Sequence, residues 1–163
     1  MIDIEVATAP SAEDLECISQ GIQAYNRLVT PPIPEVSEEL RFAVFARDAD
    51  GHVVGGIRAA AFWGYLCIEL LWLAERARGR GVGRRLMHRA ERFAAGNGFK
   101  YARVETTSFQ ARPFYEKLGY ELFGVLEDFP LGHTSYYLRK PLQPDSAPCR
   151  SDFGRDSAKP AKT

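Results

Sequence analysis

The chain has 163 residues, 45% hydrophobic and 12% aromatic, and its 21 basic and 21 acidic side chains give a formal net charge of zero. This size and composition suit one globular domain that buries its own core. No apolar run approaches the roughly 20 residues that a membrane-spanning helix needs. The acidic first five residues lack a signal-peptide pattern. We therefore expect a cytoplasmic protein without a membrane partner.

Neither a metal site nor a disulfide framework is expected. The cysteines and histidines are scattered and lack metal-ligand spacing, at Cys17, Cys67, Cys149, His52, His88 and His133.

The N-terminal part predicts a strand, a helix and a loop. Residues Ile2 to Ala7 alternate apolar and acidic side chains, which favours a strand. Residues Ala12 to Leu28 have helical spacing, with Ser11 as the expected N-cap. The proline-rich stretch Val29 to Pro34 predicts a loop.

Three strands are expected next. Phe42 to Ala46 and Val53 to Ala60 flank the turn residues 48–51, which predicts a hairpin. A turn at Trp63-Gly64 leads into the apolar run Leu66 to Leu73, which is typical of a buried strand.

A glycine-rich turn, Arg78-Gly79-Arg80-Gly81-Val82-Gly83, follows this strand, and Val82 to Ala95 has helical spacing. Such a turn directs backbone N–H groups at one spot, where the helix N-terminus favours phosphate. Neither the Walker A nor the Rossmann spacing is present. The alternative is a plain turn beside a solvated helix face, but the local excess of arginine favours a phosphate site. The arginines are Arg76, Arg78, Arg80, Arg84, Arg85, Arg89 and Arg92.

A second motif follows the predicted strand Tyr101 to Thr106. The stretch from Ala111 to Tyr120 predicts a short helix, because Pro113 is tolerated in a first turn and Gly119 suits a left-handed C-terminal cap.

The remaining sequence predicts a closing pair of strands, Tyr120 to Leu126 and Ser135 to Leu138. From residue 143 the composition turns polar and proline-rich, so we expect one domain over 1–142 and a disordered tail over 143–163. The order of elements predicts an α/β fold, in which a meander and a parallel βαβ unit form a mixed sheet covered by helices.

Both motifs resemble those of the GNAT superfamily of N-acetyltransferases. Arg78, Gly81 and Gly83 match its acetyl-CoA pyrophosphate loop, and Ala-x-x-Phe-Tyr-x-x-x-Gly-Tyr from Ala111 to Tyr120 matches its second motif. The resemblance covers about Leu66 to Leu142 and implies the GNAT fold. That fold has a mixed sheet of six or seven strands, flanked by helices, in which the strands Leu66–Leu73 and Arg103–Thr106 splay apart. Ser108 stands where many members have asparagine.

The resemblance implies acetyl-CoA as co-substrate and backbone donors near Leu71 and Leu73 for the pantetheine and the thioester carbonyl. The cofactor-binding residues that it implies are Leu71, Trp72, Leu73, Arg78, Gly79, Arg80, Gly81, Val82, Gly83, Arg84 and Ser108.

The resemblance makes Tyr115 the candidate general acid, with a core aromatic as the alternative. Glu69 alternates with Leu71 and Leu73, so we expect all three on one face of the strand, with Glu69 as general base or substrate contact. Glu105 and the loop residue His133 are further candidates, and a reaction without a protein base stays open.

The expected activity is transfer of an acetyl group from acetyl-CoA to a primary amine of a small molecule or peptide, in a ternary complex. The alternatives are an acyl-CoA sensor without turnover and nucleic-acid binding, against which the zero net charge argues. A homodimer is also open. Residues expected near the acceptor are Tyr25, Asn26, the loop 31–34, Phe62, Trp63, Tyr65 and Phe129.

Overall fold

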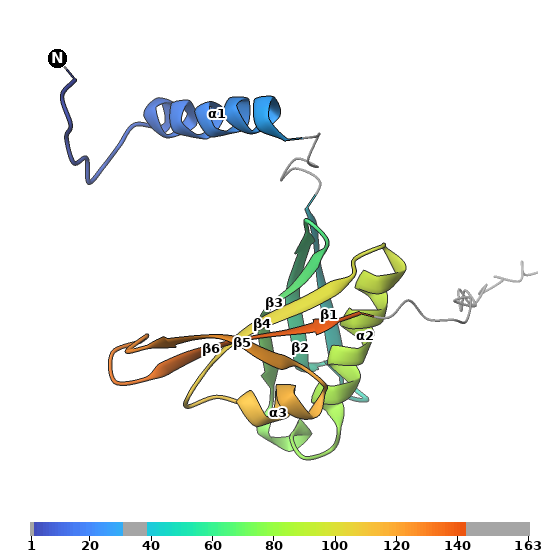
Figure 1. The fold of residues 1–163 in the computed structure, drawn as a ribbon. Coiled ribbons are helices and arrows are strands. Elements are labelled where there is room, and N and C mark those ends of the chain that lie inside the picture. Colours follow the sequence, from blue (N-terminus) through green and yellow to red (C-terminus); the bar gives the residue numbers. More distant parts are fainter. Residues whose placement is uncertain (1, 31–38, 143–163) are drawn as a thin grey trace, which may run out of the picture. The chain divides into compact units, whose positions relative to one another are not determined.

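The computed structural model describes residues 2–30 and 39–142 (Figure 1). The chain divides into two units between Glu38 and Glu39, and each unit is treated by itself. Of the predicted loop Val29 to Pro34, residues 31–34 lie outside the described residues, and Val29 belongs to the preceding helix. The predicted tail also lies outside the described residues, and the single domain over 1–142 stays a prediction. In the described ranges, no helix is long and apolar enough to cross a membrane.

The first unit contains helix α1, Ala12–Val29, close to its predicted bounds. The Ser11 hydroxyl accepts a hydrogen bond from the Asp14 backbone N–H at 3.0 Å, which confirms the N-cap. The predicted strand Ile2 to Ala7 is wrong, because these residues have no regular structure. Alternation stabilises a strand only where its apolar side is buried, and Ile2, Ile4 and Val6 are 90–94% exposed.

The second unit is a six-stranded sheet with helices, which confirms the predicted mixed sheet (Figure 1). The sheet order is β1-β2-β3-β4-β6-β5, so the last strand lies inside the sheet and β5 at its edge. The elements are β1 Leu40–Arg47, β2 Val53–Phe62, β3 Tyr65–Leu73, the 3-10 helix η2 Glu75–Ala77, α2 Val82–Gly96, β4 Tyr101–Thr107, α3 Arg112–Lys117, β5 Glu121–Glu127 and β6 Thr134–Pro141.

Strands β3 and β4 separate halfway along their length. Only residues Tyr65–Ile68 of β3 pair in parallel with residues Tyr101–Val104 of β4. Beyond them, β3 continues to Leu73 and β4 continues to Thr107. Beyond this point β3 pairs only with β2, and β4 only with β6. The predicted splay is therefore confirmed.

The sheet of the second unit has two unlike faces. Helix α2 packs one face, here called the helix side, and buries Leu86, Met87, Ala90 and Ala94 against strand residues such as Leu66. On β1 and β4 every second residue is exposed. We call the face that carries Arg41, Arg58, Arg103, Glu105 and Arg139 the open side, because these residues alternate with residues that pack on the core.

Candidate active site

The glycine-rich turn joins β3 to α2 and has the backbone of an anion-binding loop. Gly79 and Gly81 adopt the left-handed conformation, with φ of 68° and 71°, and Gly81 is the N-cap of α2. A Cβ atom at either glycine would meet no heavy atom within 4 Å. The space before the first turn of α2 is therefore open, and its backbone N–H groups can reach a ligand there.

Gly83 is needed for another reason, the close approach of three elements. A Cβ atom there would lie 3.3 Å from the Phe114 ring and 3.4 Å from Leu73 Cδ1. The absence of a side chain lets the start of α2 pack against the end of β3 and against α3. A pocket of about 440 Å³, lined by Ala74, Glu75 and Arg76, lies beside the loop.

Some arginines of the loop are bonded to other residues, and others are exposed without a carboxylate partner in the described residues. Arg78 Nε donates to the Leu73 carbonyl oxygen at 3.1 Å, so Arg78 also caps the end of β3. Arg76 pairs with Asp48 at 2.9 Å. Arg80, Arg84 and Arg85 are exposed and, in the part of the chain that the structure describes, have no carboxylate partner. Their uncompensated charge favours phosphate oxygens.

The unpaired edge of β3 lies next to this loop. Residues Leu70 to Leu73 pair with β2, and no residue of β4 pairs with them. Alternate backbone N–H groups in this stretch must therefore point away from β2, toward the splay. Leu71 and Leu73 pack their side chains on the core. This edge offers the donors expected near Leu71 and Leu73.

Tyr115 lies in α3, on the helix side of the sheet. Its side chain is 7% exposed, and its ring packs edge-on against Phe114 and Tyr120. In the described ranges, no hydrogen bond joins its hydroxyl group to another residue. Burial raises the pKa of Tyr115 above its ordinary value near 10, so the hydroxyl keeps its proton at neutral pH. Tyr115 thus belongs to the core by its burial, and its role as general acid stays a prediction.

Ser108 and His133 meet at the end of the β4–β6 ladder. Ser108 Oγ lies 3.3 Å from His133 Nδ1, and the Ser108 backbone N–H donates to the Thr134 carbonyl oxygen at 2.8 Å. The His133 ring also contacts the Phe109 ring edge-on. Two residues that the sequence analysis treated separately are thus neighbours.

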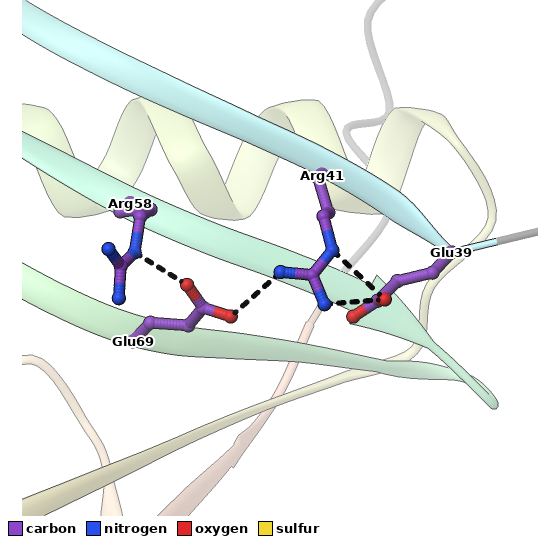
Figure 2. Close-up of polar contacts among 4 residues, drawn as sticks. All are labelled: Glu39, Arg41, Arg58 and Glu69. Carbon is purple, nitrogen blue, oxygen red and sulfur yellow. Dashed lines mark hydrogen bonds and ion pairs between the residues drawn. The ribbon is translucent and has the colours of Figure 1, made fainter. Parts of the chain in front are cut away.

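The expected orientation of Glu69 is wrong. A register shift opposite Arg58 and Ala59 inserts Glu69 as an extra residue in β3, a β-bulge that interrupts the alternation. Glu69 therefore faces the open side, whereas Leu71 and Leu73 pack on the core. Figure 2 shows the carboxylate among arginine side chains, with the helix behind the strands.

Both carboxylate oxygens of Glu69 have arginine partners (Figure 2). Arg58 Nε donates to Oε2 at 2.7 Å, and Arg41 Nη1 lies 3.6 Å from Oε1. Arg41 in turn donates to Glu39. We call these four residues, Glu39, Arg41, Glu69 and Arg58, the open-side ion-pair network. It orients Glu69 and neutralises its charge.

Glu105 also faces the open side, across the splay from Glu69. It lies opposite Tyr137 in the β4–β6 ladder. The pKa of Tyr137 is raised, first by burial and then by the charge of Glu105 and their hydrogen bond. Glu105 is thus oriented by a neutral hydroxyl, and no ion pair in the described ranges neutralises it.

The structure places the remaining predicted residues in different surroundings. Tyr25 and Asn26 belong to α1 in the first unit. Tyr65 stacks on Tyr101 and Phe62 contacts Trp63, while Phe129 is exposed at the start of the loop between β5 and β6.

Sequence reasoning missed two polar networks. Arg58 stands between Ile57 and Ala59 in β2, whose other residues are mostly small and apolar. A charged side chain in such a run indicates an ion-pair partner, which here is Glu69. On the helix side, buried Glu91 accepts hydrogen bonds from Tyr120 Oη at 2.9 Å and from Lys140 Nζ at 2.8 Å. Nothing local could reveal that cluster, because its partners are 29 and 49 residues away.

One group of possible metal ligands was also missed, in the hairpin turn with Asp48, Asp50 and His52. Asp48 already accepts hydrogen bonds from the backbone N–H groups of Asp50 and His52 and pairs with Arg76. Desolvation raises the pKa of Asp48, but these hydrogen bonds and the charge of Arg76 together lower it below its ordinary value. The turn and its ion pair account for this arrangement.

Comparisons with known proteins agree with this geometry. The model of the Acetyltransferase (GNAT) family matches residues 14–120. The blasticidin-S acetyltransferase of Streptomyces morookaense is 38% identical over 120 residues, which cover 73% of this chain and 88% of that protein. An acetyltransferase from Agrobacterium fabrum is 29% identical over 104 residues, 64% of this chain and 76% of the relative.

A solved structure has the same fold. The crystal structure of an acetyltransferase from Bacillus cereus superposes with a TM-score of 0.73 at 29% identity, over 85% of this chain and 98% of the other. Together with the glycine-rich loop, the splayed strands and the second motif, these matches show that the chain belongs to the GNAT acetyltransferase family.

Proposed function

We propose that this protein transfers the acetyl group of acetyl-CoA to a primary amine by direct attack in a ternary complex. The convergence of three features at Gly83 carries the proposal. The open glycine loop, the unpaired edge of β3 and the unpartnered Tyr115 hydroxyl belong to elements that meet there.

The loop supplies the expected binding site for the pyrophosphate. The left-handed Gly79 and Gly81 expose backbone donors, and the N-terminus of α2 adds about half a positive charge. Arg80, Arg84 and Arg85 can donate in pairs to phosphate oxygens. The pantetheine arm then follows the unpaired edge of β3, where backbone N–H groups bond its amides.

The two sides of the sheet supply different parts of the reaction. Backbone donors of β3 stabilise the negative charge that develops on the thioester oxygen. The amine attacks the carbonyl carbon, so a C–N bond forms and the C–S bond breaks. Tyr115, on the helix side, gives its proton to the leaving sulfur. The amine loses its extra proton on the open side, to a carboxylate or to water.

Glu105 is the better base of the two glutamates. Both oxygens of Glu69 are held by guanidinium groups, so a proton taken by Glu69 would disrupt ion pairs. Glu105 has a tyrosine hydroxyl as its neighbour and no cation pairs with it in the described ranges. We assign proton acceptance to Glu105, directly or through a water molecule, and orientation of the site to Glu69.

The relative from Streptomyces morookaense is named as an acetyltransferase of blasticidin S, a small molecule, and the alignment covers 88% of its length. This similarity favours a small-molecule acceptor. Purified protein should therefore release CoA thiol from acetyl-CoA in the presence of an amine from a panel that includes blasticidin S. The acetylated amine should appear in equal amount by mass spectrometry.

The alternative is a domain that binds acyl-CoA without turnover. It predicts saturable binding of acetyl-CoA and no amine-dependent thiol release with the whole panel. Thiol release without an acetylated amine would indicate hydrolysis and would contradict transfer.

A further inference from the structure

Two arginines face each other on the open side of the sheet. Arg103 of β4 and Arg139 of β6 are direct cross-strand neighbours in the antiparallel ladder. Both side chains are exposed, and each follows a buried core residue, Ala102 or Leu138. Like charges directly opposite each other destabilise a sheet. The contact between these two arginines therefore does not itself stabilise the sheet.

Glu121 of β5 lies opposite Arg139 in the β5–β6 ladder, but no salt bridge joins a carboxylate to either guanidinium in the described ranges. Arg103 Nε donates to Cys67 Sγ at 2.9 Å, and its guanidinium carbon lies 5.9 Å from the centre of the Phe62 ring. Arg139 lies 6.0 Å from the centre of the Phe123 ring. These contacts hold the two side chains by their Nε atoms or flat faces. The terminal nitrogens, which form the carboxylate-binding fork, stay available.

The pair lies beside the transfer site. Arg103 pairs with Cys67 in the last pair but one of the β3–β4 ladder before the splay, and Glu105 is the next residue on its face. Because a strand rises about 3.3 Å per residue, Arg103 and Glu105 are about 7 Å apart along β4. An acceptor whose amine is near Glu105 can thus place a group a few bonds away between the arginines.

We propose that Arg103 and Arg139 form a subsite for a carboxylate group of the acceptor, which is therefore an amino acid or a similar amino-carboxylate molecule. This assignment rests on the proposed function for the identity of the acceptor. Its physical basis is separate: two guanidinium groups on adjacent strands, neither in a salt bridge within the described ranges, match the two oxygens of one carboxylate.

The first test measures binding without any transfer. The protein saturated with CoA is titrated with matched acids and amides, such as β-alanine against β-alaninamide and phenylalanine against phenylalaninamide. The Arg Nε–Hε signals are followed by ¹⁵N NMR, and Arg103→Lys, which lacks this group, assigns the Arg103 signal. The acids should shift the Arg103 and Arg139 signals and the amides should not. Equal shifts, or none with any acid, would overturn the subsite.

The second test uses acetyl transfer. Arg103→Gln and Arg139→Gln should each raise KM for an acidic acceptor about 10- to 100-fold. The KM for the paired amide and the affinity for CoA should stay unchanged. Arg103→Lys should recover part of the loss. Arg47→Gln is the matched control, because Arg47 is an exposed arginine of the edge strand β1 that donates to the Gly51 carbonyl oxygen.

Phosphoethanolamine, added to both tests, separates a carboxylate site from a general anion site. If it competes as well as β-alanine, the assignment to a carboxylate is wrong. If acids shift the arginine signals but no amine is acetylated, the subsite stands and the proposed transfer fails. If amines are acetylated but acids and amides behave alike in both tests, the transfer stands and the subsite fails.

Discussion

The two faces of the sheet use glutamate for opposite purposes. On the helix side, Glu91 is 8% exposed and joins α2 to Tyr120 and to Lys140 of β6. On the open side, the Glu69 side chain is 28% exposed and belongs to the open-side ion-pair network. Desolvation makes the first cluster intolerant of a missing partner, whereas water can replace partners in the second. A similar set of contacts thus stabilises the fold on one face and orients a site on the other.

The sharpest test of this contrast is the stability of two alanine variants. Glu91→Ala leaves the Tyr120 hydroxyl and the Lys140 ammonium without their partner, so we expect a loss of about 2 to 4 kcal/mol in the free energy of unfolding. Glu69→Ala is the matched control and should lose less than about 1 kcal/mol. Urea unfolding measures both. Similar losses for the two variants would remove the distinction between the faces.

The helix side should also supply the acid. We expect Tyr115→Phe to lower kcat about 10- to 100-fold, because the leaving sulfur loses its proton donor. The affinity for acetyl-CoA should not change. Turnover with a saturating amine and calorimetric titration with acetyl-CoA measure the two quantities. Unchanged turnover would leave Tyr115 as a core aromatic residue only.

On the open side, the two glutamates should differ in how they affect the reaction. Glu105→Gln should lower kcat about 10-fold or more at neutral pH, since the amine loses its proton acceptor. Glu69→Gln should chiefly raise KM for the amine, because the open-side ion-pair network loses one charge and no longer orients its arginine side chains. Steady-state kinetics separate the two effects. A larger loss of kcat in Glu69→Gln would exchange the assigned roles.

The smallest effect is expected on stability at high pH. The pKa of Tyr120 is raised in the folded protein, first by burial and then by Glu91. A group with a raised folded pKa stabilises the protein below its unfolded pKa, which is about 10 for tyrosine. The free energy of unfolding should therefore fall as pH rises above about 10, and fall less steeply in Tyr120→Phe. Identical slopes for both proteins would exclude this contribution.

Most of the second unit follows from local sequence signals. The turn residues 48–51 placed β1 and β2, and helical spacing after the glycine-rich turn placed α2, because these patterns act over a few residues. The orientation of Glu69 was not accessible, since a β-bulge depends on pairing with the neighbouring strand. The position of β6 between β4 and β5 is likewise a property of the whole sheet.

Long-range polar contacts show the same limit. Tyr115 and Glu105 could be singled out from motif and residue type, but their surroundings could not. The unpartnered hydroxyl of Tyr115 and the facing pair Arg103 and Arg139 depend on elements that are distant in sequence. The strand predicted over residues 2–7 was wrong for a related reason, because an alternating pattern specifies a strand only where another strand pairs with it.

We expect the open glycine loop to bind the pyrophosphate of acetyl-CoA, and calorimetric titration measures this binding without any transfer. The wild-type protein should bind acetyl-CoA at one site per chain, with a dissociation constant on the order of micromolar. Gly81→Glu should weaken binding by at least ~100-fold, because a side chain and a negative charge would fill the open space before α2. Gly98→Glu, at a left-handed glycine beyond the other end of α2, should bind like the wild type. Absence of binding to the wild type, or unchanged binding to Gly81→Glu, would exclude the glycine loop as the pyrophosphate site.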